Sequence, residues 1–395
     1  MKQHHHVFQI LICIFAPNMK KIIITLMLIT STLSAFSQKK LIKKLFSSDT
    51  TRHNSFLPVP LFGYSQEAGF EFGAVGIYSF YIDKADTIIR ASQVYGVAYT
   101  STKGVTQISA RGDIWSKKNK WHHIYEARFS NTPFNFYGLG NQTLRADEDL
   151  ITQKRYRFNT EIERQLTKSY YPGLGVEFES LNFKDREAGG IFDTESQAPL
   201  FDKDGGRFLL LKLTQLLDTR NSNTYTTKGF YTRLRYGYAP NLFGGNNFTG
   251  NLFTADARYF YTPTKKLTIG SQLFYETISS KNEIPFYLLR QLGNDQIMRG
   301  YYLGRYRDRN YLALQAELRL RLIDRLGLVA FGGTGSTYGK DANVTQNLKP
   351  NYGIGTRIFF DLDKSLALRL DYGWGEKPTG EKRISGLYIS LGESF

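Results

Sequence analysis

The segment Leu312-Ala-Leu-Gln-Ala-Glu-Leu-Arg-Leu-Arg-Leu322 alternates between two kinds of side chain. Its even positions are Leu or Ala, and its odd positions from Gln315 onward are polar or charged. A period of two is that of a β-strand, because successive side chains of a strand point to opposite faces. Apolar residues on one face and charged residues on the other are typical of a strand that separates lipid from the polar lumen of a membrane barrel. One such strand could also face the core of a soluble sandwich.

The alternation recurs along most of the chain, for example over residues 253–261 and 366–374. No stretch shows sustained helical periodicity, and after residue 37 no apolar run approaches the roughly 20 residues that a transmembrane helix needs. The chain also contains 26 Tyr and 29 Phe, many of them near the ends of the alternating segments. The sequence therefore predicts an all-β fold, an antiparallel transmembrane β-barrel of about sixteen strands.

An even number of strands places both ends of the barrel on the periplasmic side. Short connections at Lys117-Lys118, Lys168-Ser169, Pro263-Thr264 and Asp363-Lys364 are then periplasmic turns, and the longer stretches 132–150, 185–205 and 280–307 are external loops. The expected strands cover residues 57–65, 69–82, 88–101, 103–116, 119–131, 151–167, 170–184, 206–219, 228–242, 249–262, 265–279, 308–323, 326–338, 349–362, 365–375 and 383–395.

The last expected strand ends on an aromatic residue. Residues 386–395 alternate up to Phe395, which we expect to lie at the lipid interface and, with Leu391, to form the barrel-closure signal. Glu393 lies on the same face and interrupts the apolar stripe. The partner across the closure is the short first strand, which carries Pro58 and Pro60.

The beginning of the chain predicts an exported protein. A signal peptide is expected over residues 1–37, with the true start expected at Met19, an apolar run over residues 22–33 and small residues near Ser37. The histidine triplet at residues 4–6 then precedes the true start; the alternative is a metal site. Cleavage would remove the only cysteine, Cys13, so neither a disulfide nor a cysteine-linked lipid is expected.

Residues 38–56 are predicted to form a short basic periplasmic lead-in, and residues 57–395 the barrel. The lead-in could also form a helix that plugs the barrel, or a docking segment for a partner. Removal of residues 1–37 leaves 48 basic and 35 acidic residues, a net charge of +13. Nucleic acid is not an expected partner of an exported barrel, whereas outer-membrane lipid and lipopolysaccharide are, through basic side chains at the rim.

Inward-facing arginines leave two interpretations open, because they could favour anions in the lumen or pair with acidic residues there. They are Arg233, Arg235, Arg319, Arg357 and Arg369.

Little in the sequence points to catalysis. Of the histidines after residue 37, His122 and His123 are adjacent in one expected strand, so their side chains should point to opposite faces and not share a metal ion. A barrel phospholipase would need a serine beside one of them, an alternative that the sequence leaves open. We expect no enzymatic activity, no metal and no cofactor.

One loop motif connects the chain to a known family. Residues 297–301, Ile-Met-Arg-Gly-Tyr, lie between the eleventh and twelfth expected strands. Further motifs are Phe136-Tyr-Gly-Leu-Gly-Asn141, Asp218-Thr-Arg-Asn221 with Thr227-Lys-Gly-Phe230, and Leu368-Arg-Leu-Asp-Tyr-Gly373 with residues 392–395. In these positions the chain resembles the BamA/TamA-type barrels, also called the bacterial surface antigen family of Gram-negative outer membranes.

The resemblance implies that the sixth external loop folds into the lumen and is held there by an arginine. Arg299, Gly300 and Tyr301 match the loop signature, and Glu317 is the expected acidic partner of Arg299. The family also has a Phe-x-Asp-x-Gly motif on the thirteenth strand, where this chain has Gly333 in place of the aspartate. Asp371 or Asp256 could compensate for that loss; the alternative is that Arg299 is a solvated loop arginine.

The function implied by the resemblance is assembly of outer-membrane proteins or lipid, through opening between the first and last strands. The residues between Gln38 and Leu57 are too few for a POTRA domain, so we expect a member without one, which would rely on a separate periplasmic partner or on other outer-membrane proteins. A passive pore and an accessory scaffold barrel are the alternatives.

Overall fold

The computed structural model describes residues 54–86, 89–195, 199–245, 247–340, 342–345, 347–362 and 365–395. The expected signal peptide, the lead-in up to residue 53 and the turn at Asp363-Lys364 lie outside the described residues.

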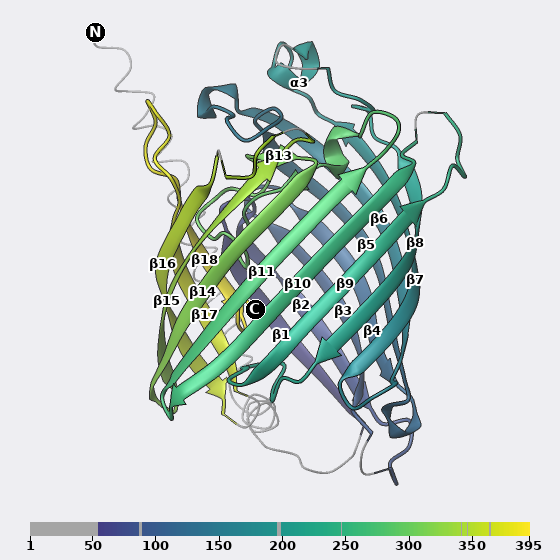
Figure 1. Ribbon diagram of the computed structural model, residues 1–395, viewed down its shortest axis with the longest axis vertical. Helices are drawn as coiled ribbons and strands as arrows, with labels where there is room; N and C mark the ends of the chain where they lie inside the picture. Colours follow the sequence, from purple (N-terminus) through teal and green to yellow (C-terminus); the bar gives the residue numbers. More distant parts are fainter. Residues whose placement is uncertain are drawn as a thin grey trace, which may run out of the picture. The chain divides into compact units, whose positions relative to one another are not determined.

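Sixteen antiparallel strands close into a barrel, as the alternation predicted (Figure 1). Every neighbouring pair is consecutive in the chain except the closing pair, β1 with β18, and the pair β11 with β14, which flank a long loop. The barrel strands are β1 (Ser55–Ser65), β2 (Gly69–Phe80), β3 (Ser92–Ser101), β4 (Thr106–Trp115), β5 (Trp121–Phe136), β6 (Asp149–Arg164), β7 (Tyr170–Lys184), β8 (Arg207–Asp218), β9 (Gly229–Ala239), β10 (Gly250–Thr264), β11 (Leu267–Ser279), β14 (Asn310–Ile323), β15 (Leu326–Tyr338), β16 (Lys349–Asp361), β17 (Leu366–Trp374) and β18 (Ser385–Leu391).

The remaining elements are small. β12 (Arg290–Gln291) and β13 (Arg307–Asp308) pair with each other inside the loop between β11 and β14. The helical turns are η1 (Lys117–Asn119), η2 (Arg145–Asp147), α3 (Ile191–Thr194) and η3 (Phe286–Leu288). Within the described ranges, none of the helices combines the length and the apolar character needed to span a membrane.

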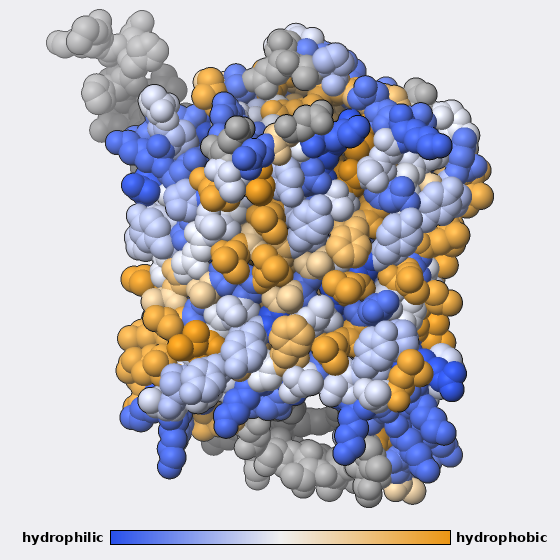
Figure 2. Space-filling view, viewed as in Figure 1, coloured by the Kyte–Doolittle hydropathy of each residue, from blue (hydrophilic) through white to orange (hydrophobic). Residues whose placement is uncertain are grey.

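The side chains of β14 sort by face as the sequence indicates. Leu314 and Leu318 are 54% and 49% exposed on the outer surface, whereas Glu317 is fully buried. Because the barrel is closed, every strand has a partner on both edges and the outer surface can be apolar without leaving open backbone groups. Figure 2 shows the resulting mixture of apolar and aromatic side chains between two hydrophilic rims.

The two ends of the barrel differ in the length of their connections. The end that carries α3 and β13 in Figure 1 holds the long connections 185–206 and 280–309, whereas the opposite end holds two-residue turns at 265–266 and 324–325. Lys117-Lys118 and Lys168-Ser169 lie in short turns, as expected. Pro263-Thr264 instead lies at the end of β10, and the turn comes at the next two residues.

The closure of the barrel is its weakest junction. β1 aligns with β2 along its whole length, from Ser55↔Ser79 to Ser65↔Gly69, and β17 aligns with β18 from Leu368 to Trp374. Between β1 and β18 the one Cα register pair is Tyr64↔Ile389. The first and last strands therefore meet as predicted, but over a very short length.

The end of the chain departs from the prediction. β18 ends at Leu391, and residues 392–395 leave the barrel wall. Phe395 is buried at 5% exposure and packs 6.1 Å from the ring of Phe260, an inward-facing residue of β10, so it does not lie at the lipid interface. Leu391, in contrast, is 51% exposed on the outer surface.

We expect the cost of an arginine on the lipid face to depend on its depth in the membrane. Leu318→Arg lies near the middle of β14 and should destabilise the barrel by about 2–4 kcal/mol, whereas Leu322→Arg, near the rim, should cost about 0–1 kcal/mol. Urea unfolding of the reconstituted protein measures both. Equal costs at the two positions would contradict the placement of β14 across the bilayer.

Candidate functional site

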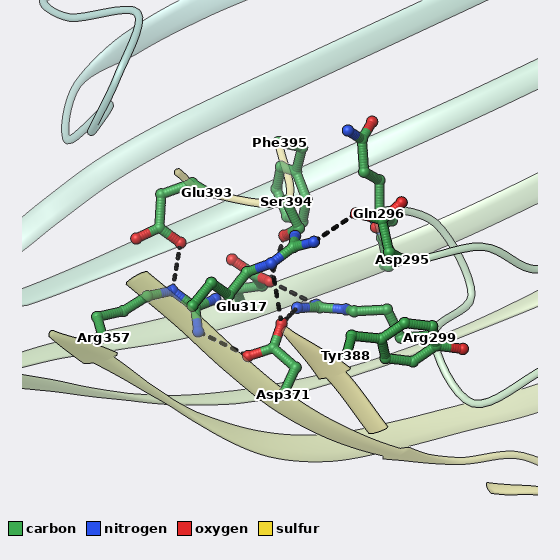
Figure 3. Close-up of polar contacts among 12 residues, drawn as sticks. Asp295, Gln296, Arg299, Glu317, Arg357, Asp371, Tyr388, Glu393, Ser394 and Phe395 are labelled. Carbon is green, nitrogen blue, oxygen red and sulfur yellow. Dashed lines mark hydrogen bonds and ion pairs between the residues drawn. The ribbon is translucent and has the colours of Figure 1, made fainter. Parts of the chain in front are cut away.

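Arg299 connects the loop between β11 and β14 to two strands of the barrel wall (Figure 3). Its side chain is fully buried, with Nη2 donating to Glu317 Oε1 on β14 and Nη1 donating to Asp371 Oδ2 on β17 at 2.5 Å. A guanidinium presents a rigid fork of donors, which suits two carboxylates approaching from different directions. The predicted pairing of Arg299 with Glu317 is present, and Arg299 is not a solvated loop residue.

A third strand contributes an aromatic face to the same arginine. The guanidinium carbon of Arg299 lies 3.5 Å from the ring centroid of Phe331 on β15. A cation above an aromatic ring is attracted by the electron-rich face, and more strongly where water is excluded. Arg299 is thus held between two carboxylates and one ring.

The two carboxylates belong to a closed cycle of three arginines and three acids, which we call the charge ring. Its members are Arg299, Glu317, Arg319, Glu393, Arg357 and Asp371, and positive and negative side chains alternate around it. Arg299 pairs with Glu317, and the other N···O distances are 2.8 Å for Glu317–Arg319, 3.8 Å for Arg319–Glu393, 2.8 Å for Glu393–Arg357, 2.6 Å for Arg357–Asp371 and 2.5 Å for Asp371–Arg299. Burying a charge is costly unless it is paired, and the charge ring has no net charge.

The chain terminus supplies part of this cycle. Glu393 pairs with Arg357 and Arg319, and the Ser394 hydroxyl donates to Glu317 Oε1 at 2.6 Å. Arg319 Nη2 donates to the carbonyl of Phe395 at 2.8 Å. The terminus therefore shares one partner, Glu317, with Arg299 of the loop and binds two further arginines of the charge ring.

The inward course of the terminus corrects the expectation for Phe395. Gly392 adopts φ +80°, a conformation that turns the chain out of the strand and that glycine accepts without strain. Glu393 on the lipid side would be an unpaired charge in hydrocarbon, whereas inside it meets two arginines. The interruption of the apolar stripe by Glu393 was the sequence signal for this turn.

Gly300 lets the loop backbone lie directly against β17. It has φ +110°, and a Cβ on Gly373 would come within 2.7 Å of the Arg299 carbonyl oxygen. The N–H of Gly300 donates to the Tyr388 hydroxyl on β18 at 3.0 Å, and its carbonyl accepts from the Gln66 amide at 3.2 Å. The glycine of the loop motif thus contacts the last strand and the first connection of the barrel.

Tyr301, the aromatic residue of the motif, is fully buried. Its hydroxyl donates to the Pro350 carbonyl at 2.6 Å and accepts from the N–H of Glu376 at 2.8 Å. Burial raises the pKa of the Tyr301 hydroxyl, which therefore keeps its proton and remains a donor. Two residues further along the loop, the N–H of Leu303 donates to the Glu67 carboxyl group at 2.7 Å. Burial also raises the pKa of that carboxyl group.

The structure decides which residue replaces the missing aspartate at Gly333. Asp371 binds Arg299, and a glycine beside it makes room, since a Cβ on Gly355 would lie 1.9 Å from Asp371 Oδ1. Asp256 instead accepts from Arg258 at 3.0 Å and from Gln272 at 2.9 Å. The second carboxylate that binds Arg299 therefore comes from β17. We call the pairing of Arg299 with Glu317 and Asp371 the loop lock.

The other inward arginines pair with acidic groups. Arg233 binds Glu163 at 2.7 Å, and Arg235 lies 3.5 Å from Glu161. Arg369 Nη2 lies 2.6 Å from Asp295, in the same loop as Arg299. Of the two interpretations of the luminal arginines, the structure shows pairing.

The adjacent histidines point to opposite sides of β5, as predicted. The ring nitrogens of His122 lie 2.9 Å from Asp113 and 2.9 Å from Glu163. His123 Nε2 lies 2.9 Å from the Thr160 hydroxyl on the exposed side of the strand.

Comparisons with known proteins give one family and a set of similar structures. The model of the Omp85 superfamily domain matches residues 89–395. A search of curated proteins found no match.

Three solved barrels illustrate the structural similarity. BamA from Haemophilus ducreyi lacking POTRA domains 1–3 aligns with a TM-score of 0.58 at 10% identity, over 86% of this chain and 70% of that one. CdiB from Escherichia coli aligns with a TM-score of 0.55 at 10% identity, over 88% and 68%. CdiB from Acinetobacter baumannii aligns with a TM-score of 0.52 at 11% identity, over 85% of this chain and 59% of its own length. At these identities the similarity concerns the fold.

The loop lock predicts different effects of two aspartate substitutions. Asp371→Asn removes a buried charge partner of Arg299 and should lower the free energy of unfolding by about 3–5 kcal/mol, visible as loss of heat resistance of the folded form on gels. Asp256→Asn is the matched control and should lower heat resistance much less, because Asp256 and its partner Arg258 are partly exposed. A reversed order of the two variants would contradict the assignment.

Proposed function

This chain belongs to the Omp85 superfamily, and we propose that its barrel is an integral bacterial outer-membrane protein that helps to insert outer-membrane proteins or lipid by opening between β1 and β18. The observation that carries the proposal is the closure, where the first and last strands share the single register pair Tyr64↔Ile389. A closed barrel holds its wall together by interstrand hydrogen bonds, so the shortest ladder is the place where it opens at least cost.

The composition of β1 supports an opening at this edge. Pro58 and Pro60 have no N–H, and because N–H groups alternate along a strand, both missing donors lie on the same edge. The ladder between β1 and β2 is continuous through both prolines, from Pro58↔Gly76 to Pro60↔Ala74. The missing donors are therefore best placed on the edge that faces β18.

The inner attachments of the last strand define what would stay in place when the barrel opens. Tyr388 on β18 accepts from Gly300, and Glu393 and Ser394 beyond the strand bind Arg357 and Glu317. These bonds hold the end of the chain to the loop and to the barrel wall. The β1–β2 connection joins them at Gln66, whose amide donates to the Tyr388 hydroxyl at 2.8 Å and to the Gly300 carbonyl at 3.2 Å, so opening would have to break these two bonds. We infer that β1 moves away from a β18 that stays attached to the lumen.

The remaining assignments belong to this proposal. Outer-membrane lipid, lipopolysaccharide, other outer-membrane proteins and a separate periplasmic protein are the proposed partners. We propose that the barrel has no enzymatic activity of its own.

A covalent lock across the closure tests the function. In a Cys13→Ser background, Tyr64→Cys with Ile389→Cys should form a disulfide, because opposed residues of antiparallel strands have the required spacing. Oxidised protein should lower the abundance of other folded barrels in the outer membrane as depletion does, and reduction should restore it. The matched control is Leu234→Cys with Ala255→Cys, a register pair between β9 and β10 that should have no effect.

The same experiment separates the insertion role from its alternatives. If the oxidised protein, with its closure locked by the disulfide, supports normal levels of other barrels while depletion lowers them, opening is not required and an accessory scaffold role is favoured. If depletion itself has no effect, the insertion role is wrong. A steady open conductance of the purified protein in planar bilayers would favour the passive pore.

A further inference from the structure

The two ends of the barrel carry different charge. Among the described residues of the connections at the end with the two-residue turns, eleven are Lys or Arg and three are Asp or Glu, a net charge of +8. The connections at the opposite end contain fourteen of each among their described residues, a net charge of zero. The eleven basic residues, which we call the basic rim, are Lys84, Arg90, Lys117, Lys118, Lys120, Lys168, Arg220, Lys228, Lys265, Lys266 and Arg325.

Among the described residues, the basic rim follows the barrel end from the β2–β3 connection to the β14–β15 connection instead of forming one patch. Its members come from the connections β2–β3, β4–β5, β6–β7, β8–β9, β10–β11 and β14–β15. All of them except Arg220 are exposed, and Arg220 pairs with Asp218 at 2.9 Å. Lys117 pairs with Asp83 at 3.0 Å while 71% of its side chain remains exposed.

Large exposed apolar and aromatic side chains lie next to the basic rim, near the ends of β5, β10 and β14 and, for Leu166, in the β6–β7 turn. Trp121, Leu166, Tyr261 and Ile323 are 44%, 57%, 53% and 63% exposed. The guanidinium of Arg164 lies 5.5 Å from the Trp121 ring. Aromatic residues of this kind occupy the boundary between hydrocarbon and headgroups, so the lysines just beyond them reach the level of the lipid phosphates.

We propose that the basic rim binds the phosphates of anionic phospholipids in the periplasmic leaflet. The short turns mark the periplasmic end of an outer-membrane barrel, and each lysine or arginine near an anionic membrane surface contributes about 1 kcal/mol of attraction. A row of basic residues along most of the circumference fits the annulus of lipid that surrounds a barrel, whereas an acidic protein would contact one sector of it. This lipid preference does not depend on whether the closure opens.

Spin-labelled lipids test the proposal on the full chain reconstituted in phosphatidylcholine vesicles. The fraction of label immobilised by the protein should be higher for phosphatidylglycerol than for phosphatidylcholine. The preference should be about fivefold, the ratio that ~1 kcal/mol gives, and should fall as salt is raised. Equal immobilisation of the two labels by the unchanged protein would overturn the proposal.

Two charge-reversed variants locate the preference. Replacement of Lys120, Lys168, Lys265 and Lys266 by Glu changes three turns of the basic rim and should remove it. The matched control replaces Lys281, Lys340, Lys377 and Lys382, exposed lysines at the opposite end, by Glu and should keep it. Loss of the preference in both variants, or in neither, would overturn the assignment.

A milder variant guards against misfolding. Lys265→Gln with Lys266→Gln neutralises one two-residue turn and should lower the preference partly, with unchanged heat resistance on gels. If this folded variant keeps the full preference and the four-lysine variant does not fold, the basic rim is not the lipid site. An acidic protein that binds the unchanged chain and displaces labelled phosphatidylglycerol from it would assign the surface to a protein partner.

Discussion

The pairing of one buried guanidinium is the interaction on which the arrangement of this lumen depends. Arg299 is fully buried, and an arginine cannot lose its charge to escape the cost of burial. It therefore requires carboxylates, and the carboxylates in turn need further donors to hold their second oxygens. The result is a cycle with no net charge that joins the loop between β11 and β14 to β14, β16, β17 and the terminus.

The same constraint explains features that otherwise look unrelated. Gly355 leaves space for the Asp371 carboxylate, and Gly300 and Gly373 let two backbones touch beside Arg299. Gly392 turns the terminus inward so that Glu393 completes the cycle. Arg299 of the loop and the chain terminus thus meet at Glu317 within one charge ring. The end of β18 is held from inside at the junction where the barrel wall has its shortest ladder.

The charge of the barrel is divided between the inside and one end. Inside, arginines of the barrel strands such as Arg233, Arg319 and Arg357 are matched by acids. Among the described residues of the connections, the excess of basic over acidic residues lies at the end with the two-residue turns, beside aromatic side chains of the outer surface. A protein with paired arginines inside and a basic rim attracts anionic partners to its edge rather than through its interior.

The sequence by itself determined the features that depend on neighbouring residues: the strand faces, the alternation of short turns and long loops, and the opposed histidines on β5. It also identified Arg299 and Glu317, the arginine through the resemblance of the loop motif to the family signature and the glutamate through its inward position on the next strand. Asp371 was left beside Asp256 as an open choice, because both face inward and alternation cannot tell which acid reaches the guanidinium.

Only the tertiary structure made that choice, since the order and stagger of the strands around the barrel set the distances between inward side chains. It also placed Phe395 inside, although the alternation of its own strand predicts an outward position. The pairing of Glu393 with distant arginines turns the last residues into the lumen and outweighs the exposure of Phe395 to lipid. The tertiary structure also set the short length of the β1–β18 ladder. That length depends on how far two strands from opposite ends of the sequence overlap when the barrel closes.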